Sequence, residues 1–313
     1  MTTLSRVGVA LPGAVEPVAD VLSRAGCTPL ERKMFAKVYG LRDSPVLAAG
    51  ERMEDLLASA ALSALDGGSA SLVLYGHTLL MAELDLCGGF PDRLRSRLGL
   101  SDARFFGLSH INCASVLRGV EFARQYLDRP DARPDERVLV LGGDQGSANE
   151  ASRYIQGTTV SGDAAAAVVV GRSGGRYRYL GGAGARDVRF HRSMRMSEAE
   201  FAQFGQVCGA LAVSTMRQAC AAAGLELDDI DWVLPHLSNR MFWRTFASES
   251  GIPRSRICLD LIAERGHNFG ADALMALEHE DRLGRLRPGD VCALIAIGQG
   301  AYFQALVVSV EES

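Results

Sequence analysis

Short apolar segments alternate along this chain with longer segments of helical period. Strands are predicted where runs rich in Val, Leu and Ile occur, at residues 7–13, 71–77, 104–113, 137–143, 164–171, 176–182, 231–236, 257–262, 291–298 and 303–310. Helices are predicted between them, at residues 51–66, 114–128, 203–223, 238–250 and 270–284. Strands that are apolar throughout and separated by helices indicate a sheet covered on both faces. The pattern therefore predicts an α/β fold.

The order of these elements repeats once. In the first half LSHINCAS leads into a helix and then the strand VLVLGG, and in the second ERGHNFGAD leads into a helix and then VCALIAIG. Val138 follows Cys113 by 25 residues, and Val291 follows His267 by 24. The general alternation of α/β chains is the other explanation of this match. We expect two similar halves packed face to face, residues 1–171 and 172–313.

Composition narrows the class of protein. Of 313 residues 48% are hydrophobic and 22% charged, which is enough apolar material for a sizeable core. The net charge of −4 gives no reason to expect nucleic acid as a partner. No apolar run approaches the roughly 18 residues of a membrane span, and MTTLSR is not a signal peptide, so we expect a cytoplasmic protein. The 7 cysteines form no CxxC pair, and no metal or nucleotide motif is present.

Cys113 is the first candidate for chemistry. The segment after it places Val116 and Val120 on one face of an amphipathic helix, so Cys113 is predicted at a helix N-terminus. Unpaired backbone amides at that position favour the thiolate, which is the form that attacks a thioester carbonyl. Taken alone, the segment fits a buried, inert cysteine at least as well.

Two histidines are the next candidates. His236 ends a predicted strand in VLPHLSN, and His267 and Asn268 lie between two glycines in ERGHNFGAD. Histidine exchanges a proton near neutral pH, and the glycines permit a sharp turn close to a ligand. A solvated loop histidine and an ordinary turn are the alternatives. If the halves repeat, Cys113 and both histidines lie at strand-to-helix turns, where open α/β sheets form their sites.

In their order along the chain these segments resemble the thiolase-like condensing enzymes, and among them ketoacyl-ACP synthase III. That family shows ACAG around its nucleophile, where this chain has NCAS. The other similar motifs are FGDGAGAAVL with SGDAAAAVVV (161–170), PHQAN with PHLSN (235–239), GNTSAAS with GHNFGAD (266–272), KPG with RPG (287–289), and a closing GGG turn with GQG (298–300). The resemblance spans essentially the whole chain.

The resemblance implies a duplicated five-layer αβαβα fold and an acyltransferase. Cys113 would accept an acyl group from coenzyme A or an acyl carrier protein, and His236 would hydrogen-bond the thioester oxygen. His267 or Asn268 would fill the position of the family's asparagine, and the amides of Cys113 and Gln299 would form the oxyanion hole. It also implies a homodimer, no cofactor beyond the thioester substrate, no metal, and a tunnel lined by residues 77–95.

The chain departs from the family at one loop. An ungapped alignment places the family's asparagine on His267, and a shift of one residue restores Asn268. The GHxxxxD pattern, which ends at Asp272, resembles a natural-product branch whose members pass the acyl group to an oxygen, nitrogen or carrier thiol. In such an enzyme His236, or Asp272 if it faces the pocket, would be the base. Arg240 is displaced by one position from the family's arginine, so the carrier or coenzyme contact is open.

Three functions remain. The first is an acyltransferase that loads Cys113 and passes the acyl group to an acceptor, in a specialised-metabolite pathway of polyketide or fatty-acid type. The second is a decarboxylative Claisen condensation with a malonyl unit. The third is a partner subunit without activity, which the presence of Cys113 disfavours. The loop pattern favours the first function over the second.

Overall fold

The structure is a computed structural model, and it describes residues 1–79 and 89–312. One sheet runs through the molecule in the order β12-β13-β14-β11-β1-β10-β7-β5-β6, with β2 paired to β10. Its strands are β1 (Thr3–Leu4), β2 (Gly8–Ala10), β5 (Leu72–Gly76), β6 (Arg104–Leu108), β7 (Val138–Gln145), β10 (Asp163–Gly171), β11 (Tyr177–Arg186), β12 (Trp232–Pro235), β13 (Val291–Gly298) and β14 (Tyr302–Val310).

The pairing of the strands shows the repeat. In the first half β5 runs parallel to β6 and β7, β7 is antiparallel to β10, and β10 is antiparallel to β2. In the second half β12 runs parallel to β13, β13 is antiparallel to β14, and β14 is antiparallel to β11. A parallel bridge between Val233 and Ile257 takes the place of the β5–β6 pair. The short strand β1 pairs with both β10 and β11 and joins the halves.

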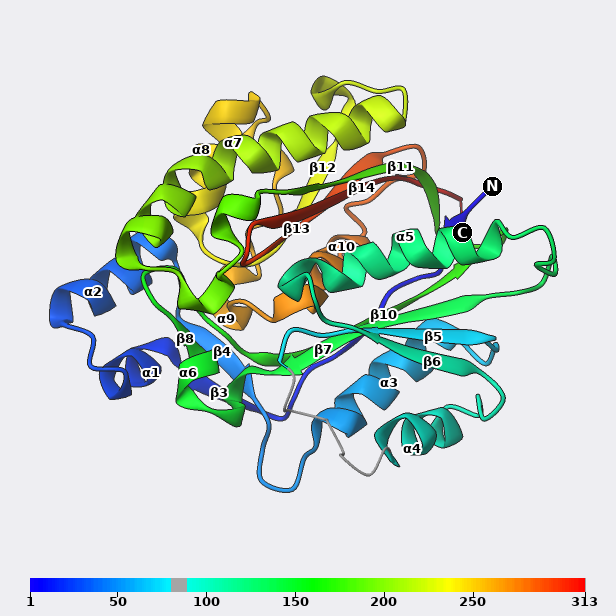
Figure 1. The fold of residues 1–313 in the computed structure, drawn as a ribbon, viewed down its shortest axis with the longest axis horizontal. Coiled ribbons are helices and arrows are strands. Elements are labelled where there is room, and N and C mark those ends of the chain that lie inside the picture. Colours follow the sequence, from blue (N-terminus) through cyan, green and yellow to red (C-terminus); the bar gives the residue numbers. More distant parts are fainter. Residues whose placement is uncertain (80–88, 313) are drawn as a thin grey trace.

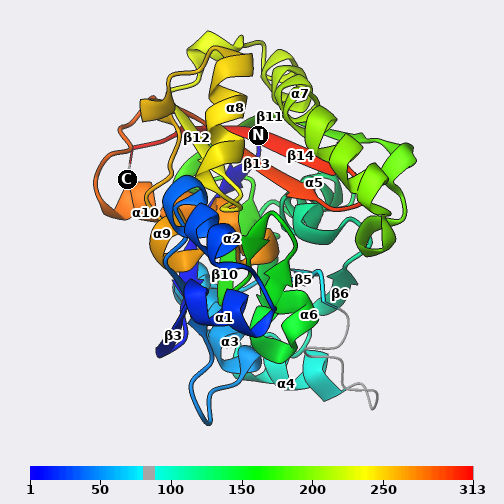
Figure 2. The ribbon, with the colours of Figure 1, turned by 90° about the vertical axis from the view of Figure 1, so that its left-hand side faces the viewer.

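Helices complete five layers (Figure 1). The outer helices are α3 (Met53–Leu65) and α4 (Gly89–Arg97) on the first half, and α7 (Glu198–Ala222) and α8 (Arg240–Ser250) on the second. Between the two halves lie α5 (Ser115–Leu127) and α10 (Asp272–Arg282), each against strands of both halves. Figure 2 shows these layers from the side, with α8 above and α3 and α4 below. The predicted α/β class and the duplicated five-layer fold are therefore confirmed.

Three hydrophobic clusters correspond to the layers. The central cluster joins apolar residues of α5 and α10 to the inner faces of both halves, and one further cluster lies under the outer helices of each half. Among the described residues, no helix is long and apolar enough to cross a bilayer.

Some elements differ from the prediction. The expected strand at residues 257–262 is wrong beyond its first residues, because only Ile257 pairs and the chain then turns into α9 (Ile262–Arg265). Elements that the pattern did not indicate are α1 (Val18–Arg24), α2 (Pro29–Met34), a π-helical turn (Phe35–Tyr39), β3 (Ala14–Pro17), β4 (Asp43–Val46), α6 (Glu150–Arg153), β8 (Tyr154–Ile155) and β9 (Thr159–Val160).

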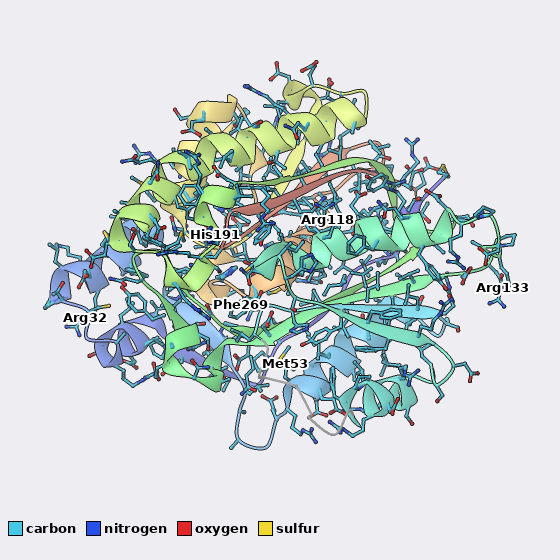
Figure 3. The ribbon with its side chains drawn as sticks, in the orientation of Figure 1. Arg32, Met53, Arg118, Arg133, His191 and Phe269 are labelled. Atoms are coloured by element: carbon cyan, nitrogen blue, oxygen red, sulfur yellow. The ribbon has the colours of Figure 1, made fainter. Side chains whose placement is uncertain are left out.

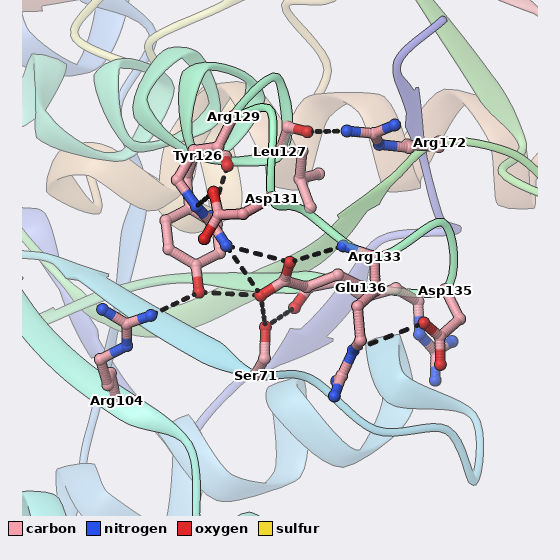
Figure 4. A network of polar contacts seen from close by, with 11 residues as sticks. Ser71, Arg104, Tyr126, Leu127, Arg129, Asp131, Arg133, Asp135, Glu136 and Arg172 are labelled. Carbon is pink, nitrogen blue, oxygen red and sulfur yellow. Dashed lines mark hydrogen bonds and ion pairs between the residues drawn. The ribbon is translucent and has the colours of Figure 1, made fainter.

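A buried carboxylate fixes the far end of α5 (Figure 4). Glu136 accepts hydrogen bonds from the Tyr126 hydroxyl at 2.9 Å, the Ser71 hydroxyl at 3.0 Å and the Arg129 guanidinium at 3.1 Å. Burial alone would raise the pKa of Glu136, but these donors and the Arg129 charge lower it. The network therefore ties the C-terminal end of α5 to the residues that precede β5 and β7.

Close packing of α3 on β2 gives a test of the fold. A Cβ added at Gly8 would lie 2.1 Å from the Ala60 carbonyl oxygen of α3, so Gly8→Ala must separate the helix from the strand. We expect a loss of about 1–3 kcal/mol in the free energy of unfolding. The control is Gly205→Ala in α7, where a Cβ would meet nothing within 4 Å and helix propensity predicts a gain of about 1 kcal/mol. Denaturant unfolding measures both, and equal stability of Gly8→Ala and the parent would contradict this packing.

Candidate active site

The turn that carries Cys113 is held from the second half of the chain. Cys113 lies in a 3₁₀ turn (Asn112–Ala114) directly before α5, as the sequence predicts. Asn112 has a φ of 51°, a left-handed conformation that asparagine tolerates better than most residues. Its side-chain amide donates to the Gln299 carbonyl at 2.5 Å and to the Ser193 hydroxyl at 3.2 Å. The nucleophile turn and the Gly298–Gly300 turn are thereby fixed to each other.

Three side chains from the two central helix starts form a hydrogen-bonded chain. The Sγ of Cys113 lies 3.3 Å from Nε2 of His267, and Nδ1 of His267 lies 2.6 Å from Oδ2 of Asp272. Asp272 is the first residue of α10 and is fully buried. Its carboxylate also accepts the backbone N–H groups of Leu237 and Asn268, each at 2.7 Å. The arrangement is a Cys-His-Asp triad in which the acid orients the imidazole.

The charge state of His267 follows from these neighbours. Burial alone would lower its pKa, but the Asp272 carboxylate and the Cys113 sulfur outweigh burial and raise it to about 10. His267 is therefore an imidazolium at neutral pH, with its Nδ1–H donated to Asp272. An imidazolium beside a cysteine favours the thiolate form of that cysteine.

His236 lies beside this triad and is neutral. It follows β12 directly, as predicted, and its ring centroid is 5.2 Å from that of His267. Burial and, after it, the charge of His267 lower the pKa of His236 to about 3. Within the described parts of the chain, its buried Nδ1 has no hydrogen-bond partner. An unpaired acceptor costs less than an unpaired N–H, so the geometry favours the tautomer with the proton on Nε2.

The side chains of Asn268 and Asp272 do not face the cavity. The resemblance implies Asn268 as an alternative for the family's asparagine, and Asp272 as a base if it faces the pocket. The Asn268 side chain turns back to its own loop, where it donates to the carbonyls of Arg265 at 3.0 Å and Gly266 at 3.2 Å. Neither Asn268 nor Asp272 lines the cavity described below. The Asn268 side chain therefore does not face the cavity, and the Asp272 carboxylate contacts His267 instead of the cavity. The physical reason is Asp272 itself, which binds the Asn268 backbone and draws the His267 ring toward the sulfur.

This geometry predicts a small effect of Asn268→Ala on catalysis. The substitution removes hydrogen bonds within the loop and no group that reaches the cavity, so we expect the acyl-transfer rate to stay within about threefold of the parent. A steady-state rate assay on the purified variant measures this. A loss of a hundredfold or more in a folded variant would return Asn268 to the site.

A cavity of about 610 Å³ opens from the triad toward the surface. Cys113, His236 and His267 line this cavity together with aromatic, aliphatic and polar residues of several elements. These include Tyr39, Thr78, Leu79, Phe201, Phe204, Gln206, Met241, Phe242, Thr245, Glu249, Phe269, Ile297 and Gln299. Figure 3 shows Phe269 at the centre of the molecule, near the start of α5. Of the predicted tunnel segment 77–95, residues 80–88 lie outside the described residues.

Sequence reasoning missed Thr78, whose hydroxyl lies 3.7 Å from Sγ of Cys113. The repeat could have indicated Thr78. The segment SLVLYGHT (71–78) corresponds to DWVLPHLS (231–238), so Thr78 in the first half is equivalent to Ser238 in the second. Both residues line the cavity.

Among the described residues, two groups of side chains have the spacing of metal ligands. His236, His267 and Asp272 offer ligand atoms within 4.8 Å of one another, but Oδ2 of Asp272 already accepts from His267 and Leu237. Asp260, His279 and Glu280 form the second group. There the Arg285 guanidinium contacts the Asp260 carboxylate at 2.8 Å and the Glu280 carboxylate at 3.2 Å. In each group the carboxylates therefore already accept hydrogen bonds or form ion pairs.

Comparisons with known proteins agree with this fold. Residues 220–310 match the family model described as 3-oxoacyl-[acyl-carrier-protein] synthase III C terminal. A 3-oxopimeloyl-[acyl-carrier-protein] synthase of Rhodothermus marinus is 26% identical over 96% of this chain and 92% of its own length. A β-ketoacyl-[acyl-carrier-protein] synthase III of Rhizorhabdus wittichii is 25% identical over 86% of this chain and 88% of its own.

Solved structures are similar over nearly the whole chain. The acyltransferase ChlB3 superposes with a TM-score of 0.85 at 20% identity, covering 99% of this chain and 98% of its own. The 3-oxoacyl-[acyl-carrier-protein] synthase III of Aquifex aeolicus does so with a TM-score of 0.83 at 18% identity, covering 99% and 100%. The fold is that of the thiolase-like condensing enzymes. Within that fold the chain resembles the ketoacyl-ACP synthase III group, through the match of residues 220–310 and the two relatives at 26% and 25% identity.

Proposed function

We propose that this protein is an acyltransferase that carries the acyl group on Cys113 and passes it to an acceptor without extending it. The observation that supports this proposal is the chain from Sγ of Cys113 through His267 to the buried Asp272. A base held by a carboxylate, within hydrogen-bond distance of the nucleophile, serves both the loading and the unloading of an acyl group.

In the first half-reaction the Cys113 thiolate attacks the thioester carbonyl, and a carbon–sulfur bond forms. The carbonyl electrons move to the oxygen, which His236 through Nε2–H and the backbone amides of Cys113 and Gln299 would stabilise. The intermediate then expels the donor thiol, which takes its proton from the His267 imidazolium. The products are acyl-Cys113, the free donor thiol and a neutral His267.

In the second half-reaction neutral His267 accepts the proton of an acceptor hydroxyl, amine or thiol as that group attacks the acyl carbon. The bond to Sγ breaks, and Cys113 leaves as a thiolate beside the imidazolium that has formed again. Asp272 stabilises the positive ring in both steps and holds its Nε2 toward the sulfur. Every proton that leaves one reactant arrives on another, so no further reagent is required.

The Claisen condensation is the second candidate, because Cys113, His236 and His267 line one cavity and the curated relatives are synthases. In that reaction two donors stabilise the enolate of a decarboxylating malonyl thioester. Against it stands the hydrogen bonding of Asn268, whose amide turns away from the cavity.

The experiment is an incubation of the protein with acyl-CoA and acyl carrier thioesters, followed by malonyl thioester or by alcohols, amines and carrier thiols. Transfer to one of these acceptors without release of carbon dioxide is the expected result. A 3-oxoacyl product with carbon dioxide would establish the Claisen reaction instead. No adduct from any donor would favour a partner subunit without activity.

The proposal also includes the acyl donor and the kind of pathway in which the enzyme acts. Either coenzyme A or an acyl carrier protein would present the thioester. The structural neighbour that is the priming β-ketosynthase of the R1128 polyketide biosynthetic pathway supports a role in specialised metabolism, and the neighbour ChlB3 is an acyltransferase. The R1128 protein superposes with a TM-score of 0.83 at 19% identity, covering 100% of this chain and 97% of its own. The cytoplasmic location stays a prediction from the sequence.

We also propose a homodimer formed along β6. This strand ends the described sheet and leaves one edge without a partner strand among the described residues. Phe106 on β6 is 54% exposed, and Phe122 on the neighbouring α5 is 36% exposed. Exposed aromatic residues beside an open sheet edge are typical of a surface that another chain covers. Sedimentation equilibrium of the purified protein tests this proposal.

A further inference from the structure

A second buried carboxylate lies near the triad. Asp144 belongs to the C-terminal part of β7 and is 1% exposed. Its Oδ1 accepts the backbone N–H groups of Thr78 at 2.9 Å and Leu79 at 2.7 Å, and its Oδ2 accepts that of Thr78 at 3.0 Å. Within the described part of the chain, no Lys or Arg forms an ion pair with it. A buried carboxylate without a cationic partner is costly, which points to a role that a neutral residue does not fill.

His267 is the charged side chain that acts on the pKa of Asp144. Burial raises the pKa of Asp144 to about 7, while the two backbone N–H donors and the His267 charge act in the opposite direction. The carboxylate that raises the pKa of His267 is that of Asp272 on α10, whereas Asp144 on β7 holds backbone N–H groups.

The loop that Asp144 holds contains the second polar neighbour of the nucleophile. Thr78 follows β5 by two positions, and its Oγ1 lies 3.7 Å from Sγ of Cys113. Asp144 therefore holds the backbone N–H of the same residue whose hydroxyl points at the sulfur. A shift of the Thr78 backbone would move this hydroxyl away from Sγ.

We infer that Asp144 is a positioning residue that holds the Thr78 hydroxyl as a hydrogen-bond donor to the Cys113 thiolate. The thiolate then has two donors, the His267 imidazolium and the Thr78 hydroxyl. The inference deepens the proposed function and rests on Cys113 as its nucleophile. Thr78 acts on the sulfur through an uncharged donor, and Asp144 acts through Thr78.

The test is the rate of alkylation of Cys113 by iodoacetamide as a function of pH, assigned to the Cys113 peptide by mass spectrometry. The variants are Thr78→Val, which keeps the shape and removes the hydroxyl, Thr78→Ser, which keeps the hydroxyl, Asp144→Asn, and the double variant Asp144→Asn/Thr78→Val. We expect Thr78→Val to lower the alkylation rate below pH 7 by roughly three- to tenfold, with Thr78→Ser close to the parent. Because Asp144 acts through Thr78, the double variant should lose little more than Thr78→Val alone.

Each outcome decides the inference. An unchanged profile in Thr78→Val, or losses that multiply in the double variant, would overturn it. If Asp144→Asn fails to fold, the pair of Thr78 variants still decides whether the hydroxyl acts on the sulfur. Alkylation needs no acyl donor or acceptor, so a failure of the proposed acyl transfer would leave this profile interpretable, and a failure here would leave the triad intact.

Discussion

Replacement of Cys113 by alanine is expected to abolish acylation of the protein by any thioester donor. In the proposed reaction Sγ is the atom that forms the bond to the acyl carbon, and it is the atom that lies 3.3 Å from Nε2 of His267. Removal of a nucleophile lowers turnover by roughly 10⁴-fold or more. Intact mass after incubation with the donor measures the adduct directly.

Cys208 provides the matched control for this substitution. It lines the same cavity, but burial, with the Glu249 charge as a smaller cause, raises its pKa to about 12. Cys208→Ala should therefore keep the full adduct. An acyl group that remains on Cys113→Ala and disappears from Cys208→Ala would reverse the assignment of the nucleophile.

Replacement of Asp272 by asparagine has the second largest expected effect, a loss of roughly 10²- to 10⁴-fold in the rate of acyl transfer. Asparagine keeps the size of the side chain but removes the charge that holds His267 as an imidazolium. Without it the pKa of His267 falls, because burial and the loss of the carboxylate act in the same direction. At neutral pH the ring would then be neutral, and the thiolate would lose its charged donor. The loss should be smaller at lower pH, where the ring regains its proton.

The control for Asp272→Asn lies on the same helix. Asp281 near the end of α10 is a half-buried residue whose carboxylate pairs with Arg176 at 2.9 Å, but it does not line the cavity. Asp281→Asn should lower the melting temperature and leave the acyl-transfer rate of the folded protein near that of the parent. A rate for Asp272→Asn within threefold of the parent, in a variant that is folded by circular dichroism, would contradict the triad.

Much of the fold could be predicted from the sequence because its signals are local or repeated. Apolar runs such as those at β7, β10 and β13 are buried over nearly their whole length, so their hydrophobic pattern needs no knowledge of partners. The spacing from Cys113 to Val138 and from His267 to Val291 revealed the duplication. The short elements between residues 14 and 46 lack such a signal, because they are only a few residues long and depend on contacts with distant segments, such as that of Arg153 with Glu16.

The site was predicted less completely, because the conformation of the loop at residues 266–272 decides which side chains meet. Gly266 has a φ of 56°, a left-handed turn that decides which of the next two side chains faces the sulfur. Spacing cannot reveal this choice, so the sequence left His267 and Asn268 as alternatives. Asp272 follows His267 by five positions, and only the turn into α10 brings its carboxylate to Nδ1. Asp144 gave no signal, since a carboxylate after a strand is usually solvated.

The most direct test of the triad account is a time course of intact mass for the protein mixed with one equivalent of an acyl thioester, followed by an excess of acceptor. The account predicts that one acyl group appears on the Cys113 peptide before any product, and that it leaves when the acceptor is added, without carbon dioxide. Asp272→Asn should slow both phases. Product formed with no acyl-Cys113 intermediate, or an acyl group carried by another residue, would contradict the account.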